Sequence, residues 1–212
     1  MKLNLYNITA VLALVACLLS ACSNGETTHK YVAPCQAGFD VDNLNDCTVP
    51  ARFSANDFNW MGGNLTMTVF SEDIYDAVEV TQLMAGDTLL YDGERIVVDS
   101  IAEESGSIIT INGGLEQGGA WLQAYEGGTY RGIQFDDHSM YTEQGKVQVA
   151  LAQDFVLVDC GDNPTDPDDT IRSNQKLYLE NVKEYKKDFN ELNTRVQIEG
   201  GQITMIHRRW IP

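Results

Sequence analysis

The sequence is poor in basic residues. It has 14 Lys and Arg against 31 Asp and Glu in 212 residues, so its formal net charge is −17. Binding to a nucleic-acid backbone requires a basic face that neutralises phosphates. We therefore expect no nucleic-acid partner. Hydrophobic residues make up 43% of the chain, which is enough for one sizeable domain or two small ones.

Common catalytic motifs are also missing. The chain has no Gly-x-Ser-x-Gly elbow and no Gly-Lys-Ser or Gly-Lys-Thr phosphate loop. Its histidines are His29, His138 and His207, whereas a catalytic zinc usually takes two or three imidazoles. These absences disfavour serine hydrolases, nucleotide-binding enzymes and zinc enzymes. Because the chain has so many acidic residues, a catalytic pair of carboxylates remains an alternative.

The N-terminus carries the only motif with a specific meaning. Residues 8–19 are almost unbroken apolar sequence, and Leu19-Ser20-Ala21-Cys22 follows. A run of about twelve residues is too short to cross a bilayer, which takes roughly 20, but it has the size of a signal-peptide core. The segment resembles a bacterial lipoprotein signal with its lipobox. An ordinary secretory signal that is cut after Ala21 is the alternative.

The resemblance implies a lipid anchor. In bacterial lipoproteins the thiol at the position of Cys22 is alkylated by a diacylglycerol, the preceding segment is removed, and the new amine is usually acylated. Two or three acyl chains hold a protein stably on a membrane. The resemblance therefore implies a protein of the bacterial cell envelope at the outer membrane, with the side that it faces left open. Ser23-Asn24-Gly25-Glu26 resembles a short form of the acidic stretch found in surface lipoproteins of Bacteroidota.

Three further cysteines follow the lipobox. Export would place them in an oxidising compartment, where one disulfide can form and one thiol is left over. Cys35 and Cys47 are close in sequence within a loop-like stretch, so we expect a disulfide between them. Cys160 follows an apolar strand and is either buried or paired with one of the other two.

Short alternating segments dominate the chain from about residue 60. Residues 65–70 alternate apolar and hydroxyl side chains, and 77–84 alternate again, which is typical of half-buried strands. Asp92-Gly93 predicts a type I′ hairpin turn. Other strands are expected over 88–91, 94–101, 107–111, 121–125, 130–135, 146–151, 155–159, 195–199 and 202–207. The pattern predicts a mainly β fold, an antiparallel sandwich or a partly open barrel.

One short helix is expected near the C-terminus. Apolar residues recur at three- and four-residue spacing over 179–192, which predicts an amphipathic helix. We divide the chain into a signal peptide (1–21), a tether and disulfide-containing lead-in (22–59), and a β domain (60–212). The β domain is either continuous or made of two small modules that split between about 136 and 170.

Four carboxylates gather in a proline-containing loop. They belong to Asp162, Asp166, Asp168 and Asp169. Ca²⁺ prefers such oxygen ligands, although the spacing is not that of an EF-hand loop. The loop is therefore either a calcium site or a solvated acidic surface.

Three other groups are candidate sites. Asp136-Asp137-His138 places carboxylates beside an imidazole and is either a base or metal ligand, or a polar turn. His207-Arg208-Arg209-Trp210 either receives an anion or pairs with acids of its own domain. Exposed aromatic rings would stack on sugars, whereas aromatics in strands commonly pack in cores. The candidate aromatics are Trp60, Trp121, Tyr125, Tyr130, Tyr141 and Trp210.

These observations favour a lipid-anchored envelope protein of a binding or interaction type without catalytic activity. Its partner would be a glycan, another envelope protein or Ca²⁺. One alternative is a hydrolase that uses two carboxylates on a β scaffold to cleave glycans. Another is a structural subunit of an envelope assembly.

Overall fold

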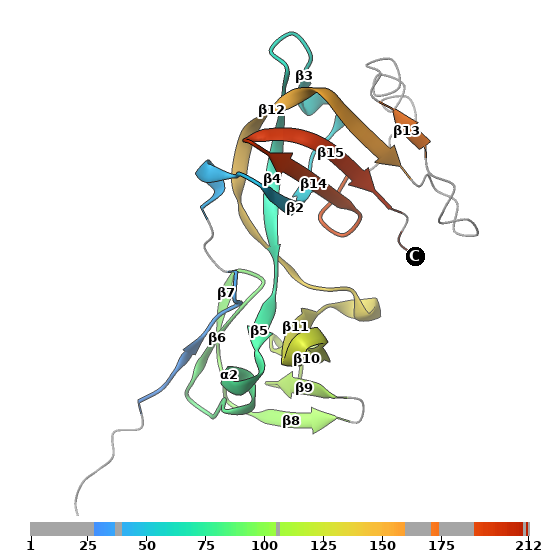
Figure 1. Cartoon of the computed structure of the whole chain (residues 1–212). Helices are drawn as coiled ribbons and strands as arrows, with labels where there is room; N and C mark the ends of the chain where they lie inside the picture. The colour runs from blue at the N-terminus through green and yellow to red at the C-terminus, as the bar shows by residue number, and fades with distance from the viewer. Residues whose placement is uncertain are drawn as a thin grey trace, which may run out of the picture.

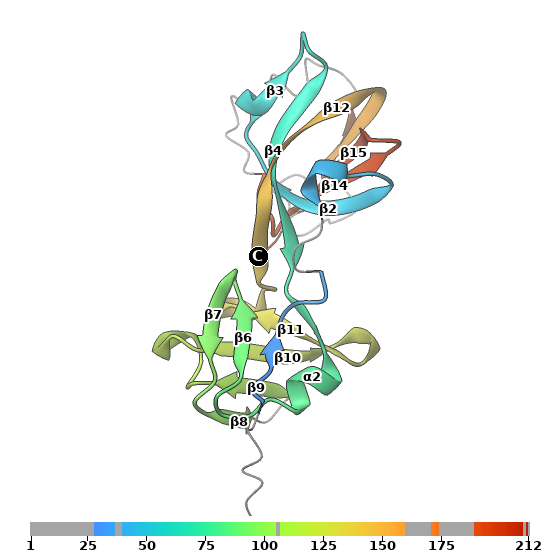
Figure 2. The same ribbon diagram turned by 90° about the vertical axis from the view of Figure 1, so that its left-hand side faces the viewer.

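Alternating apolar and polar residues form strands through most of the chain, and the fold is mainly β, as predicted (Figure 1). The computed structural model describes residues 28–36, 40–104, 107–159, 171–173, 189–209 and 211. These residues form two lobes, one above the other in Figures 1 and 2, and each lobe has its own apolar core. We call the upper one the barrel lobe and the lower one the sandwich lobe.

Five strands of the barrel lobe form a ring. They are β2 (Cys47–Arg52), β4 (Asn64–Glu72), β12 (Tyr141–Asp159), β14 (Thr194–Glu199) and β15 (Gln202–Arg208). They pair in the order β12-β15-β14-β2-β4, and β4 pairs back onto β12. Every pair is antiparallel except β12 with β15, and the ladder between β2 and β4 is short. The five strands therefore form a partly closed barrel, an architecture that hosts many functions and does not by itself assign one.

Alternation explains how the barrel fills its interior. On β4, Leu65, Met67 and Val69 are fully buried, whereas Thr66 and Thr68 between them are only partly buried. Four short elements flank the ring. They are η1 (Val41–Asn43) before β2, η2 (Ala55–Asp57) and β3 (Phe58–Asn59) between β2 and β4, and β13 (Ile171–Ser173) beside β12.

The sandwich lobe consists of two sheets that pack face to face. One sheet has the order β1-β6-β7 and the other the order β5-β11-β10-β9-β8. The strands are β1 (Tyr31–Val32), β5 (Ile74–Asp76), β6 (Thr88–Tyr91), β7 (Glu94–Val97), β8 (Ile101–Glu104), β9 (Ile108–Ile111), β10 (Ala120–Tyr125) and β11 (Thr129–Ile133). The short helices are α2 (Ala77–Thr81), η3 (Leu115–Gln117), η4 (Glu126–Gly128) and η5 (Phe135–Asp137). Leu89 from the first sheet and Leu122 from the second are fully buried in the core between them.

The two cores are not consecutive along the chain. Residues 49–69, 149–157 and 189–206 supply the barrel core, whereas Val32 and residues 75–122 supply the sandwich core. The sandwich lobe is therefore an insertion between β4 and β12, completed by β1 from the N-terminal segment. Buried Asp73 lies at this crossing, where its carboxylate accepts hydrogen bonds from the Thr142 hydroxyl at 2.6 Å and the Asp92 amide at 2.9 Å.

Local interactions explain where the secondary structure differs from expectation. The expected strand over 77–84 is wrong, because β5 ends at Asp76 and α2 begins. The Asp76 carboxylate caps that helix by accepting from the amides of Val78 and Glu79. Most of the helix expected over 179–192 lies outside the described residues. Its last part, 189–192, is not helical, since Phe189 bridges to Phe53 and a turn follows.

The expected disulfide between Cys35 and Cys47 is not formed. Both thiols are free. Different sheets hold the two residues: the Cys35 amide donates to the Ile74 carbonyl of β5, whereas Cys47 pairs with Ile198 in the barrel. Both nevertheless line one hollow of about 500 Å³. Cys22 and Cys160 lie outside the described residues.

We expect iodoacetamide to alkylate Cys35 faster than Cys47 near pH 8. Cys35 is exposed, whereas burial raises the pKa of the half-buried Cys47 above its ordinary value, so a smaller fraction of it is thiolate. Mass spectrometry of the labelled peptides over a pH series would measure both rates. Equal rates, or a peptide in which the two cysteines are cross-linked, would contradict the free-thiol arrangement.

Candidate functional site

An aromatic surface lies on the outer face of the five-stranded sheet, over β10 and β11. On β10, Ala120 and Leu122 point into the core, so Trp121, Gln123 and Tyr125 point outward. Opposite Gln123 lies Arg131 of β11. Period-two alternation thus brings two aromatic rings, an amide and a guanidinium to one face. We call Trp121, Gln123, Tyr125, Arg131 and Phe135 the aromatic surface.

Arg131 is held firmly within this surface. Its Nε and Nη2 donate to the Gln123 side-chain oxygen at 3.0 and 2.6 Å, and its Nη1 donates to the Ser139 hydroxyl at 3.2 Å. The guanidinium lies 5.1 Å from the centre of the Tyr125 ring. Since these partners are neutral, the positive charge of Arg131 stays uncompensated by them, and its position is set before any ligand arrives.

Trp121 and Phe135 form the second half of the surface. Their rings meet edge to face with centroids 5.6 Å apart. Phe135 is 56% exposed and Tyr125 is 40% exposed, which is unusual for large apolar side chains. Gly114 has φ +82, and a Cβ there would collide with the Trp121 indole. The glycine therefore sets how closely the turn after β9 approaches the indole.

This geometry suits a sugar ring. Aromatic faces pack against the apolar C–H faces of a pyranose, while guanidinium and amide groups hydrogen-bond its hydroxyls. The exposed rings and the fixed polar groups lie side by side on one sheet face. The aromatic surface is therefore the best candidate binding site among the described residues.

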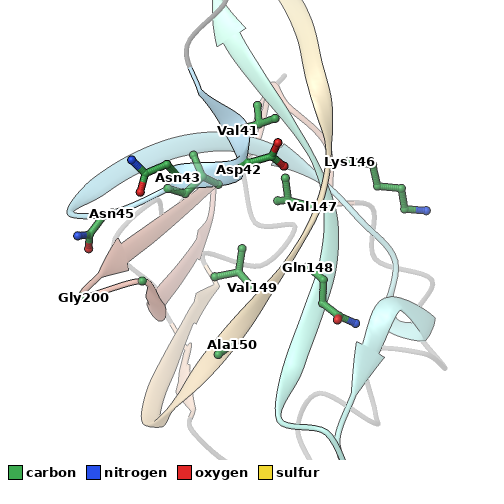
Figure 3. A pocket seen from close by; sticks show the side chains of 12 residues that line it. Val41, Asp42, Asn43, Asn45, Lys146, Val147, Gln148, Val149, Ala150 and Gly200 are labelled. Carbon is green, nitrogen blue, oxygen red and sulfur yellow. The ribbon is translucent and has the colours of Figure 1, made fainter.

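A hollow of about 490 Å³ opens on the barrel lobe (Figure 3). It is lined by 41–45, by 146–150 of β12 and by the Gly200-Gly201 turn. Figure 3 shows Lys146 and Gln148 directed away from η1. The hollow therefore combines apolar residues of β12 with the amides of 43 and 45, and it contains none of the residues that the sequence singled out.

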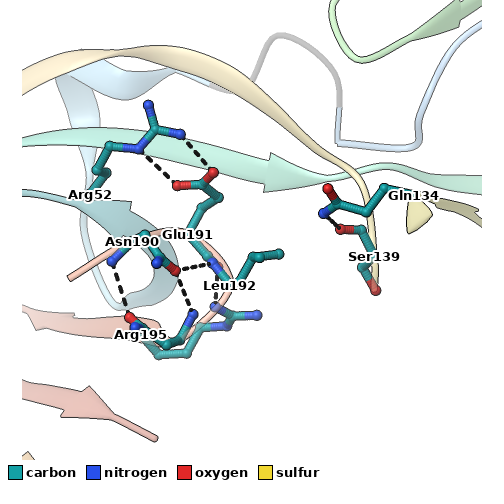
Figure 4. A network of polar contacts seen from close by, with 8 residues as sticks. Arg52, Gln134, Ser139, Asn190, Glu191, Leu192 and Arg195 are labelled. Carbon is teal, nitrogen blue, oxygen red and sulfur yellow. Dashed lines mark hydrogen bonds and ion pairs between the residues drawn. The ribbon is translucent and has the colours of Figure 1, made fainter. Parts of the chain in front are cut away.

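Another hollow, of about 550 Å³, lies where the two lobes meet. Figure 4 shows Arg52 and Glu191 at its barrel side, joined by two hydrogen bonds of 2.9 and 2.6 Å. Asp92 of the β6–β7 turn and Glu94, the first residue of β7, line its sandwich side. Burial raises the pKa of Asp92 above its ordinary value, and so do the carboxylates of Asp73, Glu94 and Glu191. The junction hollow therefore has an excess of negative charge.

We expect Asp92→Asn to stabilise the protein at pH 7 but less so near pH 4. A carboxyl whose folded pKa is raised contributes stability below its unfolded pKa of about 3.9 and loses it as the pH rises through the folded value. Asn carries no charge, so at pH 7 the variant avoids this loss of stability. For an exposed charge the gain is about 0.5–1 kcal/mol. Asn also suits the type I′ turn, in which Asp92 and Gly93 have φ 51 and 72.

Urea unfolding at both pH values would measure this effect, and Asp99→Asn provides a control at another exposed acid of the same lobe. A gain in the free energy of unfolding that is the same at both pH values comes from the preference of Asn for the turn. The additional gain at pH 7 comes from removing the charge. A gain that is the same at pH 4 and pH 7 would contradict the raised pKa.

The structure separates the aromatic residues that the sequence suggested. Trp121 and Tyr125 share the aromatic surface, but Tyr130 packs against the sandwich core. Trp60 stacks on Phe58 at 4.8 Å, next to the barrel core. Tyr141 is 9% exposed and accepts a hydrogen bond from Arg195. Trp210 lies outside the described residues.

The other candidates have structural roles or lie outside the description. Asp136 and Asp137 are exposed turn residues with φ 63 and 60, and the Asp137 carbonyl accepts from Arg131. Arg208 pairs with Asp159, as the interpretation of pairing within the domain predicted. The acidic loop of Asp162, Asp166, Asp168 and Asp169 is not described, so a Ca²⁺ site there stays a prediction. Within the described ranges, no three His, Cys, Asp or Glu side chains gather as they would around a metal ion.

Sequence reasoning missed Gln123, Arg131 and Phe135. Gln123 alternates with Trp121 and Tyr125 on a strand that the sequence did predict, so the common face of these three residues could have been inferred from period two. The position of Arg131 opposite Gln123 could not, because it depends on which strands are neighbours. Phe135 was expected within a strand but lies in η5, where its ring turns toward Trp121.

No protein-family model, curated protein or solved structure matches the chain. Among the described helices, none is long and apolar enough to span a bilayer.

Proposed function

We propose that this is a lipid-anchored protein of the bacterial envelope that binds glycans without cleaving them. The observation that carries the binding role is the aromatic surface, with two well-exposed rings beside a fixed guanidinium. The motif Leu19-Ser20-Ala21-Cys22 supports the anchor. An outer-membrane location follows from the same resemblance.

The surface favours a neutral sugar. Trp121 and Phe135 offer apolar area for a pyranose face, and Arg131 and Gln123 offer groups for its hydroxyls. The chain as a whole has a net charge of −17 and repels anions at long range, which disfavours highly acidic polysaccharides. The face is built from strands rather than from a deep cavity, and this suits a segment of a longer chain.

Binding of the purified protein to an array of bacterial, plant and host glycans tests the proposal. We expect binding to neutral hexose-containing oligosaccharides, with micromolar to millimolar dissociation constants. Failure to bind any glycan, together with stable co-purification of one envelope protein, would instead support the role of an assembly subunit. Detection of acyl chains on the Cys22 peptide by mass spectrometry tests the anchor separately.

Hydrolysis of glycans is a second candidate, favoured by the junction hollow. A general acid needs a raised pKa, and burial with neighbouring carboxylates raises the pKa of Asp92 in this way. Glu94 and Glu191 line the same hollow and would supply the second carboxylate. Release of reducing ends from a bound glycan, abolished by Asp92→Asn, would support hydrolysis. Glycans that bind and stay intact would contradict it.

A further inference from the structure

Four exposed apolar side chains gather at the end of the sandwich lobe that is farthest from the barrel. They are Tyr31 (51% exposed), Met84 (45%), Val97 (55%) and Ile101 (39%). Figure 2 shows β8 and the beginning of β6 at this end of the lobe. We call these four residues the basal patch. Large exposed apolar groups that cluster in this way usually mark a contact surface.

Backbone pairing and two polar side chains hold the basal patch together. Tyr31 and Val97 both pair with Thr88, so they lie in one row across the first sheet. The buried Asp87 carboxylate accepts from the amides of Lys30 and Met84 at 2.7 and 2.9 Å, which joins the N-terminal segment to the turn before β6. The Asn112 side chain binds the carbonyl of Val97 and the amides of 99 and 100, which precede Ile101.

The N-terminal segment reaches the fold at this same end. Its first described residue is Thr28, only six positions after Cys22. Six extended residues span at most about 20 Å. If acyl chains are attached at Cys22, Thr28 must lie within roughly that distance of the membrane surface, and Thr28 is three residues before Tyr31 of the basal patch.

We propose that the basal patch rests on the phospholipid bilayer that carries the anchor. This inference rests on the lipid anchor of the proposed function and deepens it. The chemistry fits an interface: tyrosine is enriched at the headgroup level of membranes, and Arg95 lies 5.3 Å from the Tyr31 ring centre, where a cation can meet lipid phosphates. The contact would hold the lobe upright and leave the aromatic surface, on the outer face of β10 and β11, open to ligands.

Hydroxyl-radical footprinting tests the orientation. The acylated full chain in nanodiscs of phosphatidylethanolamine and phosphatidylglycerol is compared with the full chain carrying Cys22→Ser. We expect oxidation of Tyr31 and Met84 to fall several-fold in the nanodisc sample. Met61, which is fully exposed in the β3–β4 turn of the barrel lobe, is the internal control and should be oxidised equally in both.

Two variants sharpen the test. Val97→Glu places a charge in the basal patch and should restore much of the oxidation of Met84, whereas Met61→Glu should not change it. Acylated Cys22 with unprotected Tyr31 and Met84 would overturn the membrane contact and leave the anchor standing. No acyl chain on Cys22 would overturn both. Protection of the patch in Cys22→Ser as well would point to a second copy of the chain as its occupant and also overturn the proposal.

Discussion

Replacing Arg208 by methionine is expected to lower the free energy of unfolding by about 3–5 kcal/mol. Arg208 and Asp159 are opposite each other on the parallel strands β15 and β12, and the guanidinium contacts Oδ1 of Asp159 at 3.0 and 3.1 Å. The side chains are 6% and 0% exposed. The substitution leaves a buried carboxylate without this cation, and that desolvation cost is much larger than for a surface pair.

Neighbouring and paired substitutions provide the controls. Arg209→Met makes the same chemical change one residue later at an exposed position, and we expect it to alter stability by less than about 0.5 kcal/mol. The double variant Asp159→Leu with Arg208→Met removes both charges and should recover much of the loss. Urea unfolding of the four proteins measures these differences. Equal effects of the substitutions at 208 and 209 would show that the ion pair does not stabilise the barrel lobe.

Trp121→Ala is expected to weaken glycan binding by about 30-fold or more, which corresponds to about 2 kcal/mol for a central aromatic contact. The indole is the ring that lies between Phe135 and the turn at Gly114, so its removal also releases the Phe135 ring from its edge-to-face contact. Titration calorimetry with an oligosaccharide selected on the array measures the affinity.

Two comparisons separate binding from folding. Tyr31→Ala removes an exposed aromatic ring from the other sheet of the same lobe and should leave the affinity unchanged. Trp121→Phe keeps a ring and should retain part of the affinity. If Trp121→Ala binds as tightly as the unmodified protein, or if Tyr31→Ala weakens binding equally, the aromatic surface is not the glycan site.

The fold class was accessible from sequence because strands have a period of two. Residues 65–70 show this directly: alternate side chains enter the barrel core, as the pattern predicted. The Asp92-Gly93 turn was equally local, since positive φ at both positions depends on these two residues alone. The wrong prediction of a strand over 77–84 also came from a local pattern. Its alternation is compatible with a strand, but the Asp76 cap favours a helix.

The candidate site was only partly accessible. Trp121 and Tyr125 were recognisable as strand aromatics, but nothing local distinguishes them from Tyr130, which faces the core. Arg208 illustrates the same limit for charges. Its partner Asp159 is 49 residues away and becomes its neighbour only because β12 and β15 are parallel.

The sequence by itself determined the β character of this protein, the faces of its strands, its tight turn and its acidic charge, because each depends on neighbouring residues or on composition. The tertiary structure alone decided that one lobe is inserted into the other and that Cys35 and Cys47 are held by different sheets. It also decided which outward faces became the aromatic surface and the basal patch. These features depend on which distant strands pair and in which register, and no local pattern specifies that pairing.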